Sequence, residues 1–230
     1  IKYKKIKWLN NLNELNNFPC IFIANEFFDA LPIKQFLKKD KKWYERYVNF
    51  ANLNKLEYLD IPFDMHKFEK KIKFKISHKQ NFVEYSPIAA KYLKTIINKI
   101  RLNDGGILII DYAYIEKEMK NTLQAVSKHK YCNILKNFRN SDITYNLNFN
   151  LINMITKQFG PCSSIFTTQK KFLTKLGILD RAEILAKNMP FSQKADIYFR
   201  IKRLIDEKQM GDLFKVMFIK NHKNKFKLGF

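Results

Sequence analysis

Two short apolar runs stand out in the pattern of hydrophobic and polar positions along the chain. PCIFIA (19–24) and GILIID (106–111) are continuous rather than alternating, which is typical of strands buried on both faces of a parallel sheet. Each run ends at polar residues, Asn25-Glu26 in the first case and Asp111 in the second. The pattern therefore predicts two strands of a parallel sheet with acids at their carboxyl ends.

A helix is predicted directly before the second strand. Ser86 is a candidate N-cap, and Pro87 fits the first helical position. Apolar residues then recur at helical spacing on one face, namely Ile88, Leu93, Ile96, Ile97 and Ile100. Gly105-Gly106 ends the helix. A helix followed at once by an apolar strand is half of a β-α-β crossover, so the pattern favours an α/β fold.

The rest of the pattern predicts further elements on both sides of this unit. PIKQFL, which begins at Pro32, is a candidate helical turn, and the alternation in KWYERYVNF and KLEYLDI predicts a β-hairpin over 42–61. Residues 120–131 predict a short helix, and the period-two pattern of 143–149 predicts a half-exposed strand. Later helices and a final strand are predicted at 150–160, 168–188, 192–207 and 213–220.

Composition supports a single folded domain. Hydrophobic residues make up 46% of the 230 residues and aromatic residues 15%, enough for a packed core. We therefore expect one α/β domain over 1–230, with an inserted helical portion at about 140–190. No apolar run approaches the roughly 20 residues of a membrane-spanning helix, and the start lacks the apolar core of a signal peptide, so no membrane partner is expected. Three widely spaced cysteines favour a reducing compartment.

The net charge of +22 is large, but it does not change the class of partner that we expect. It would suit an anionic partner such as nucleic acid. However, lysine is scattered along the chain, and Asn, Ile, Phe and Tyr are also abundant, as compositional drift would produce. RNA-reading motifs such as KGFGFVxF are absent. We therefore attribute the charge to drift and do not expect a nucleic-acid partner.

Polar side chains at the two strand ends are the candidate chemistry. In an open parallel sheet, ligands bind outside the carboxyl ends of the strands, where Asn25-Glu26 and Asp111-Tyr112 would meet in one crevice. A buried carboxylate costs several kcal/mol unless it is paired, so Glu26, beside two phenylalanines, needs a partner or a cationic ligand. The alternative is that Asn25 and Asp29 only cap the turn after the strand.

Other kinds of site find no support in the residues. The sequence contains neither GxGxxG nor GxxxxGK[ST], so the usual phosphate-binding loops are missing from it. Its four histidines lack metal-ligand spacing, and no metal is expected. Ser163-Ser164 has no nucleophile elbow around it. The residues alone indicate an α/β domain with a polar crevice and leave the reaction open.

NEFFDALP (25–32) is a more specific string. It resembles the signature of the MidA family of S-adenosylmethionine-dependent methyltransferases, relatives of the arginine methyltransferase that serves mitochondrial complex I assembly. Further strings resemble this family in the expected order, namely WYER (43–46), EYSP (84–87), GGILIIDYAY (105–114), NTLQAVSKHKY (121–131), SDIT (141–144), TQKKFLTKLGI (168–178) and GDLFKV (211–216). These ordered matches cover nearly the whole chain and are too many to arise by chance.

This resemblance implies the C-terminal part of a class I, Rossmann-like methyltransferase fold with a β-hairpin and a helical insertion. It also implies S-adenosylmethionine as the cofactor and protein arginine as the acceptor. The family positions with a catalytic role match Asn25, Glu26 and Asp29, and those near the cofactor match Asn25, Asp111 and Tyr112. The positions that match the wall of the substrate cleft are Gln124, His129, Asp142, Thr144 and Gln169.

The sequence also departs from the family pattern. The Gly-rich loop and the acid that bind the cofactor in the family have no counterpart in residues 1–20. Ala113, Asn121 and Asn146 stand where family members carry Gly, Asp and His. Two alternatives therefore accompany the methyltransferase hypothesis. One is a non-catalytic remnant or half-enzyme that pairs with a separate N-terminal half, and the other is a basic module that binds polyanions.

A sheet that lacks its first strands would leave residues 19–24 with an unpaired apolar edge, and such edges associate. We therefore expect the 230-residue chain to be poorly soluble or dimeric despite its charge. The lysine-rich start carries almost no arginine or serine, which favours a cytoplasmic location over the mitochondrial alternative.

Overall fold

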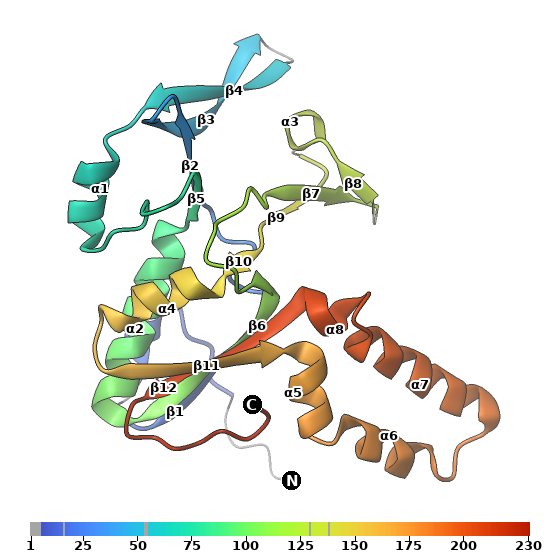
Figure 1. Ribbon diagram of the computed structural model, residues 1–230. Helices are drawn as coiled ribbons and strands as arrows, with labels where there is room; N and C mark the ends of the chain where they lie inside the picture. Colours follow the sequence, from blue (N-terminus) through green and yellow to red (C-terminus); the bar gives the residue numbers. More distant parts are fainter. Residues whose placement is uncertain (1–5, 16, 53–54, 129, 138) are drawn as a thin grey trace.

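In the part of the chain that the structure describes, the central sheet contains five strands, which are β1 (Cys20–Asn25), β6 (Gly105–Tyr114), β10 (Leu147–Asn148), β11 (Cys162–Thr168) and β12 (Phe214–Asn221). The computed structural model (Figure 1) describes all residues except 1–5, 16, 53–54, 129 and 138. The main strands lie in the order β1–β6–β12–β11. β1 and β6 are parallel, as predicted, whereas β12 runs antiparallel to β6 and β11. The close approach of β1 and β6 requires Gly105, because a Cβ atom at that position would lie 2.0 Å from the Cys20 carbonyl oxygen.

Helices α2 (Pro87–Asn103) and α4 (Phe149–Lys157) cover one face of this sheet (Figure 1). The Ser86 hydroxyl caps α2 by accepting the Ala89 N–H at 3.1 Å, as predicted. The buried face of α2 consists of Ala89, Ala90, Leu93, Ile96, Ile97 and Ile100. Ile88 is 41% exposed, so its predicted place on that face is wrong. It lines an open surface hollow instead.

A second sheet is antiparallel, in the order β4–β3–β2–β5 (Figure 1). Its strands and helix are β2 (Lys34–Lys39), β3 (Lys42–Asn52), β4 (Lys55–Pro62), α1 (Met65–Ile72) and β5 (Phe82–Tyr85). The predicted hairpin over 42–61 is confirmed as β3 and β4. The helical turn predicted from Pro32 is wrong, because β2 pairs with both β3 and β5. These bonds and the full burial of Phe36 outweigh local helical preference.

A third sheet, in the order β8–β7–β9, lies on the side where β6 ends (Figure 1). Its region contains β7 (Gln124–Ser127), β8 (Lys130–Cys132), α3 (Ile134–Asn137) and β9 (Asp142–Thr144). The helix predicted at 120–131 is wrong, because β7 is held by pairing with β8 and β9. The strand predicted at 143–149 is divided, since β9 ends at Thr144 and β10 leads into α4.

Four helices join β11 to β12 and extend to one side of the sheet (Figure 1). They are α5 (Gln169–Lys175), α6 (Ile178–Ala186), α7 (Phe191–Ile205) and α8 (Met210–Leu213). The helices and the final strand predicted in the C-terminal third are thus confirmed, apart from their exact ends. The helical segment spans 169–213, later than the predicted insertion at about 140–190, because β9, β10, α4 and β11 occupy 142–168.

β1 lies at the edge of the central sheet and, among the described strands, pairs with β6 alone. The predicted unpaired edge is therefore confirmed. The predicted burial on both faces is wrong. Phe22 and Ala24 pack against the core on the side of α2, whereas Ile21 and Ile23 are 64% and 71% exposed. A short 3-10 helix, Leu12–Glu14, precedes this strand, and no helix in the described part of the chain has the length and apolarity to cross a membrane.

Candidate active site

The loop after β1 lies against the end of β6. The Glu26 N–H donates to the Ile110 carbonyl oxygen at 2.9 Å, which continues the pairing of the two strands. Glu26 has a φ of +46°, a left-handed conformation that turns the chain at this point. Asn25 and Glu26 are exposed, and Asn25 Nδ2 donates to Glu26 Oε1 at 3.3 Å. The end of β1 therefore lies beside β6 and presents the polar atoms of Asn25 and Glu26 to solvent, whereas β6 continues past its predicted end at Asp111 to Tyr114.

Asp111 is fully buried beneath this loop. Its Oδ2 accepts the N–H groups of Phe28 at 3.1 Å and Asp29 at 3.4 Å, and its Oδ1 accepts the Tyr112 N–H at 2.9 Å. Burial and the nearby Asp29 raise the pKa of Asp111 to about 7, although these backbone donors oppose the shift. Asp111 thus fixes the loop after β1 onto the end of β6.

Asp29 is the second buried acid, with 4% of its surface exposed. Its carbonyl oxygen accepts the Tyr145 N–H at 3.1 Å. Its Oδ1 is buried and has no hydrogen-bond partner among the described residues. Burial, followed by the charge of Glu26, raises the pKa of Asp29. A buried carboxylate oxygen without a partner carries a large desolvation cost, which a cationic ligand would offset.

Aromatic rings surround these acids. Phe27 is 42% exposed and packs edge-on against Phe28 and Tyr92, with ring centroids 5.2 and 5.5 Å apart. Tyr112 is half-buried, and its ring centroid lies 4.2 Å from that of Phe214. Burial, then Glu26 and Asp29, raise the pKa of Tyr112. In the described residues no group of three His, Cys, Asp or Glu could hold a metal ion.

Glu84 organises the wall behind the site, a role that the sequence did not predict. It is buried on β5 and accepts the Gln35 side-chain amide at 2.9 Å, the Thr122 N–H at 3.1 Å and the Leu123 N–H at 3.2 Å. The Thr122 hydroxyl in turn accepts the Asn146 N–H at 3.0 Å. Burial raises the pKa of Glu84, and these donors oppose the shift. In the sequence, Glu84 stood out only as part of EYSP (84–87), a string that resembles the family but does not indicate a chemical role for Glu84.

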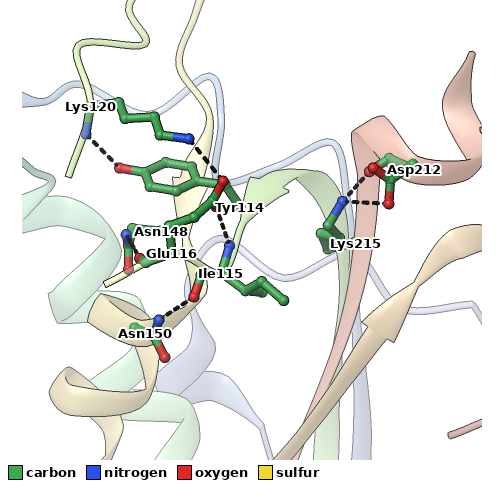
Figure 2. Close-up of polar contacts among 8 residues, drawn as sticks. All are labelled: Tyr114, Ile115, Glu116, Lys120, Asn148, Asn150, Asp212 and Lys215. Atoms are coloured by element: carbon green, nitrogen blue, oxygen red, sulfur yellow. Dashed lines mark hydrogen bonds and ion pairs between the residues drawn. The ribbon is translucent and has the colours of Figure 1, made fainter. Parts of the chain in front are cut away.

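The segment that follows β6 is held by a second set of polar contacts (Figure 2). The Tyr114 hydroxyl accepts the Lys120 N–H at 3.2 Å, and Lys120 forms an ion pair with Glu116 at 2.8 Å. Asn148 donates to the Glu116 carbonyl oxygen at 3.0 Å. Because Asn148 also caps α4 by accepting the Leu151 N–H, it joins this segment to the helical cover of the sheet.

The residues predicted for the cleft wall lie in two places. Gln124 and Thr144 face each other across β7 and β9, with Gln124 Nε2 donating to Thr144 Oγ1 at 3.3 Å, and Asp142 is exposed at the start of β9. Gln169 is buried and donates to the Leu204 carbonyl oxygen inside the helical segment. His129 lies outside the described residues. No hydrogen bond among the described residues joins these side chains to Glu26 or Asp29, so their place in the cleft stays a prediction.

Comparison with known sequences identifies relatives of the chain. A family described as putative S-adenosyl-L-methionine-dependent methyltransferases matches residues 2–166. The mitochondrial protein arginine methyltransferase NDUFAF7 homolog of Caenorhabditis elegans is 28% identical over 182 residues, which cover 76% of this chain and 42% of the relative. The Xenopus tropicalis protein arginine methyltransferase NDUFAF7 is 26% identical over 90% of this chain and 48% of its own length. The chain spans about half the length of these relatives.

Solved structures share the fold. A COG1565 superfamily member and likely methyl transferase from Burkholderia thailandensis, bound to S-adenosyl-homocysteine, superposes with a TM-score of 0.78 at 22% identity. The alignment covers 97% of this chain and 58% of that protein. A second structure of a COG1565 protein from the same organism gives the same TM-score at 23% identity. The expected methyltransferase-like α/β fold is therefore confirmed.

Proposed function

Because the chain belongs to the family of putative S-adenosyl-L-methionine-dependent methyltransferases, we propose that it forms the acceptor-binding side of an enzyme that methylates arginine in a protein. The observation that carries this proposal is the buried Asp29 Oδ1, which has no partner in the described part of the chain. It lies at the strand ends, where ligands of such sheets bind. The names of the relatives, protein arginine methyltransferases, support the choice of acceptor.

A guanidinium group suits this arrangement of acids. It is planar, carries its positive charge at all ordinary pH values and binds carboxylates through paired N–H donors. Asp29 Oδ1 would accept one such donor inside the site, and the exposed Glu26 would accept another at the entrance. Asn25, which already contacts Glu26, would hold that carboxylate in place. The three residues would thereby orient the acceptor nitrogen, and positioning supplies much of the rate in transfers of this kind.

The cofactor, when bound, supplies a methyl group on a positively charged sulfur. Asn25 and Tyr112 are the residues of this chain that would face it, because Asn25 ends β1, Tyr112 follows Asp111 on the neighbouring β6, and their side chains are exposed and half-exposed. Asp111 would act differently from the family-based expectation. Both of its oxygens accept backbone N–H groups, so it would position the loop and not contact the cofactor.

The acceptor nitrogen must lose a proton when its new bond to carbon forms. Asp29 is the natural recipient, because its pKa is raised by burial and by Glu26, and a raised pKa makes a carboxylate a stronger base. Glu26, at the exposed rim, would bind the guanidinium at the entrance and take no part in the proton transfer. This division of labour gives the two acids of NEFFDALP different roles.

The names of the relatives also bear on the compartment. Those of Caenorhabditis elegans and Xenopus tropicalis are described as mitochondrial. They support the mitochondrial alternative for this protein over the cytoplasmic location that its lysine-rich start favours.

Asp29→Asn tests the proposed function. The assay measures transfer of labelled methyl from S-adenosylmethionine to protein by the protein at its natural length, with mass spectrometry locating the modified side chain. We expect methylarginine from the wild type and a loss of at least about 100-fold in kcat for Asp29→Asn, because the base is removed while the shape is kept.

Glu57→Gln is the matched control, since Glu57 is exposed on β4 and its side chain makes no hydrogen bond or ion pair with another described residue. Its activity should equal that of the wild type. Methyl groups on lysine only, or an Asp29→Asn variant with wild-type kcat, would show that the proposal is wrong.

A further inference from the structure

The C-terminal end of α7 lies beside the candidate active site. α8 joins this end to β12, whose first residue, Phe214, stands opposite Tyr112 in the register of β12 and β6. The ring centroids of Phe214 and Tyr112 are 4.2 Å apart, and Figure 1 shows α7 reaching this junction through α8. The last turn of α7 is therefore close to the strand ends where Glu26 and Asp29 lie.

Buried contacts hold the end of α7 in this place. Gln169, one of the residues predicted for the cleft wall, is buried and donates through its side-chain amide to the Leu204 carbonyl oxygen at 2.9 Å. The Asp206 carbonyl oxygen accepts the Gly211 N–H at 2.9 Å. Gly211 approaches so closely that a Cβ atom there would lie 2.4 Å from the Ile205 carbonyl oxygen. The junction of α7 and α8 is thus fixed by backbone contacts.

Arg203, in this last turn, directs a positive charge towards Tyr112. It is exposed, and its guanidinium has no hydrogen-bond or ion-pair partner among the described residues. Arg200, by contrast, pairs with Asp196 at 2.9 Å. Burial and the acids of the loop after β1 raise the pKa of Tyr112, whereas the charge of Arg203 lowers it. Because charge effects weaken with distance and with salt, the Arg203 guanidinium lies near the Tyr112 hydroxyl.

Tyr131 approaches Tyr112 from a different element. It is 78% exposed on β8, opposite Val126 of β7, and its charge when ionised raises the pKa of Tyr112. Figure 1 shows the third sheet and α8 on different sides of the end of β6. A polypeptide that brings an arginine to Asp29 would therefore pass an exposed aromatic ring and an unpaired guanidinium.

We propose that Arg203 binds a carboxylate of the acceptor protein, carried by an Asp or Glu residue close in sequence to the arginine that is methylated. This inference rests on the proposed function, which places the acceptor arginine at Asp29. A guanidinium and a carboxylate form paired hydrogen bonds. The charge of Arg203 also repels the acceptor's own guanidinium, which is left to bind at Glu26 and Asp29. Arg203 would thus determine both the sequence around the acceptor and its orientation.

A pool of peptides tests this role of Arg203. Each peptide has a central arginine and four randomised positions on either side. The immobilised protein, at its natural length and with S-adenosyl-homocysteine present, captures peptides that are then identified by mass spectrometry. We expect Asp and Glu to be enriched about three- to fivefold at one or two of the randomised positions, as for an ion pair that stays partly exposed. Arg203→Glu should enrich Lys and Arg at the same positions instead.

Lys202→Glu is the matched control. It makes the same change of charge at the neighbouring exposed residue of α7, whose side chain points about 100° away around the helix. This variant should keep the preference of the wild type. Equal enrichment of acidic residues at every position in all three proteins would reflect the net charge of the chain, and it would overturn the proposal. The same loss of preference in Lys202→Glu would also overturn it.

Calorimetry with S-adenosylmethionine separates the acceptor from the cofactor, which carries a carboxylate of its own. Arg203→Glu should change the Kd of the cofactor by less than about twofold. A rise of about tenfold with an unchanged peptide preference would assign Arg203 to the cofactor and overturn the proposal.

Peptide capture is read without methyl transfer, so the two proposals can fail separately. A wild-type protein that shows the expected preference but forms no methylarginine refutes the proposed function and leaves the carboxylate site intact. A protein that forms methylarginine without any positional preference refutes the role of Arg203 alone.

Discussion

The carboxyl groups of Asp29 and Asp111 are both buried near the end of β1, but they differ in their hydrogen bonds. Asp111 accepts three backbone N–H groups, whereas Asp29 Oδ1 accepts none from the described residues. Burial raises the pKa of both carboxyl groups. The charge of Asp29 raises the pKa of Asp111 further, and the charge of Glu26 raises the pKa of Asp29. The first therefore holds the loop, and the second is left available for a ligand. Sequence alone shows two acids near two strand ends and cannot assign these roles, because they depend on which N–H groups reach which oxygen.

Asp111→Asn should change how stability depends on pH. The pKa of Asp111 is about 7 in the folded protein and near 3.8 when unfolded. Between these values the folded state binds the additional proton, so the contribution of Asp111 to the free energy of unfolding falls as pH rises and is lost above about pH 7. From pH 5 to pH 7.5 the wild type should lose about 2 to 3 kcal/mol relative to the variant.

Denaturant unfolding of both proteins at the two pH values measures this difference. Asparagine also places an amide group near the Tyr112 N–H, so the variant should be less stable than the wild type at pH 5. Parallel pH profiles for the two proteins would contradict the titration of Asp111 in this range.

At the scale of elements, the prediction succeeded where the pattern of a segment reflects its own burial. The buried face of α2, the core position of β6 and the hairpin of β3 and β4 follow from spacing, because period 3.6, continuous apolar runs and period 2 report which faces meet the core. It failed for β2 and β7. Both are strands because two other strands pair with each of them, one adjacent in sequence (β3 and β8) and one remote (β5 and β9). The spacing of apolar residues within β2 or β7 does not record these partners.

Glu84 accepts hydrogen bonds from residues that are remote from it in the sequence, so its removal should lower the free energy of unfolding. In Glu84→Ala the N–H groups of Thr122 and Leu123 and the Gln35 amide lose their acceptor. We expect a loss of about 3 kcal/mol in the free energy of unfolding, measured by chemical denaturation, because buried donors without partners cost about 1 to 3 kcal/mol each and water can replace part of the loss. Glu84→Gln keeps one acceptor oxygen and should lose only about 1 kcal/mol. Equal losses in the two variants would show that volume, not hydrogen bonding, accounts for the effect.

At the scale of the whole molecule, a net charge of +22 opposes an apolar edge that favours association. Charge repulsion keeps copies of the chain apart at low salt, and the exposed Ile21 and Ile23 draw them together once the charge is screened. Whether copies of the chain associate therefore depends on the net charge of the whole molecule and not only on the two isoleucines.

The isolated 230-residue chain should therefore self-associate more as salt is added. Raising salt from about 0.1 M to about 1 M shortens the Debye length from about 10 to about 3 Å, which weakens repulsion while the apolar edge is unaffected. Light scattering after size exclusion measures the mass. Ile23→Lys should keep the chain monomeric, whereas Phe199→Lys, equally exposed, should not. A wild-type chain that remains monomeric at about 1 M salt would contradict this expectation.

The fold class, the family and the position of the candidate site could all be predicted from the order of the amino acids. Continuous apolar runs that end in Asn25-Glu26 and Asp111 are local features, and they can be read without knowing what lies beside them. NEFFDALP added the chemistry by resemblance, since the residue types alone left the reaction open.

Which groups are buried, paired or exposed could be seen only in the folded chain. It placed Asp29 Oδ1 without a partner, made Glu84 the acceptor for a distant loop and left Ile21 and Ile23 open to solvent in a run that reads as interior. The physical reason is that desolvation, hydrogen bonding and strand pairing depend on atoms brought together from remote parts of the chain. A residue's type sets what it can do, and its neighbours in space decide which of these possibilities is realised.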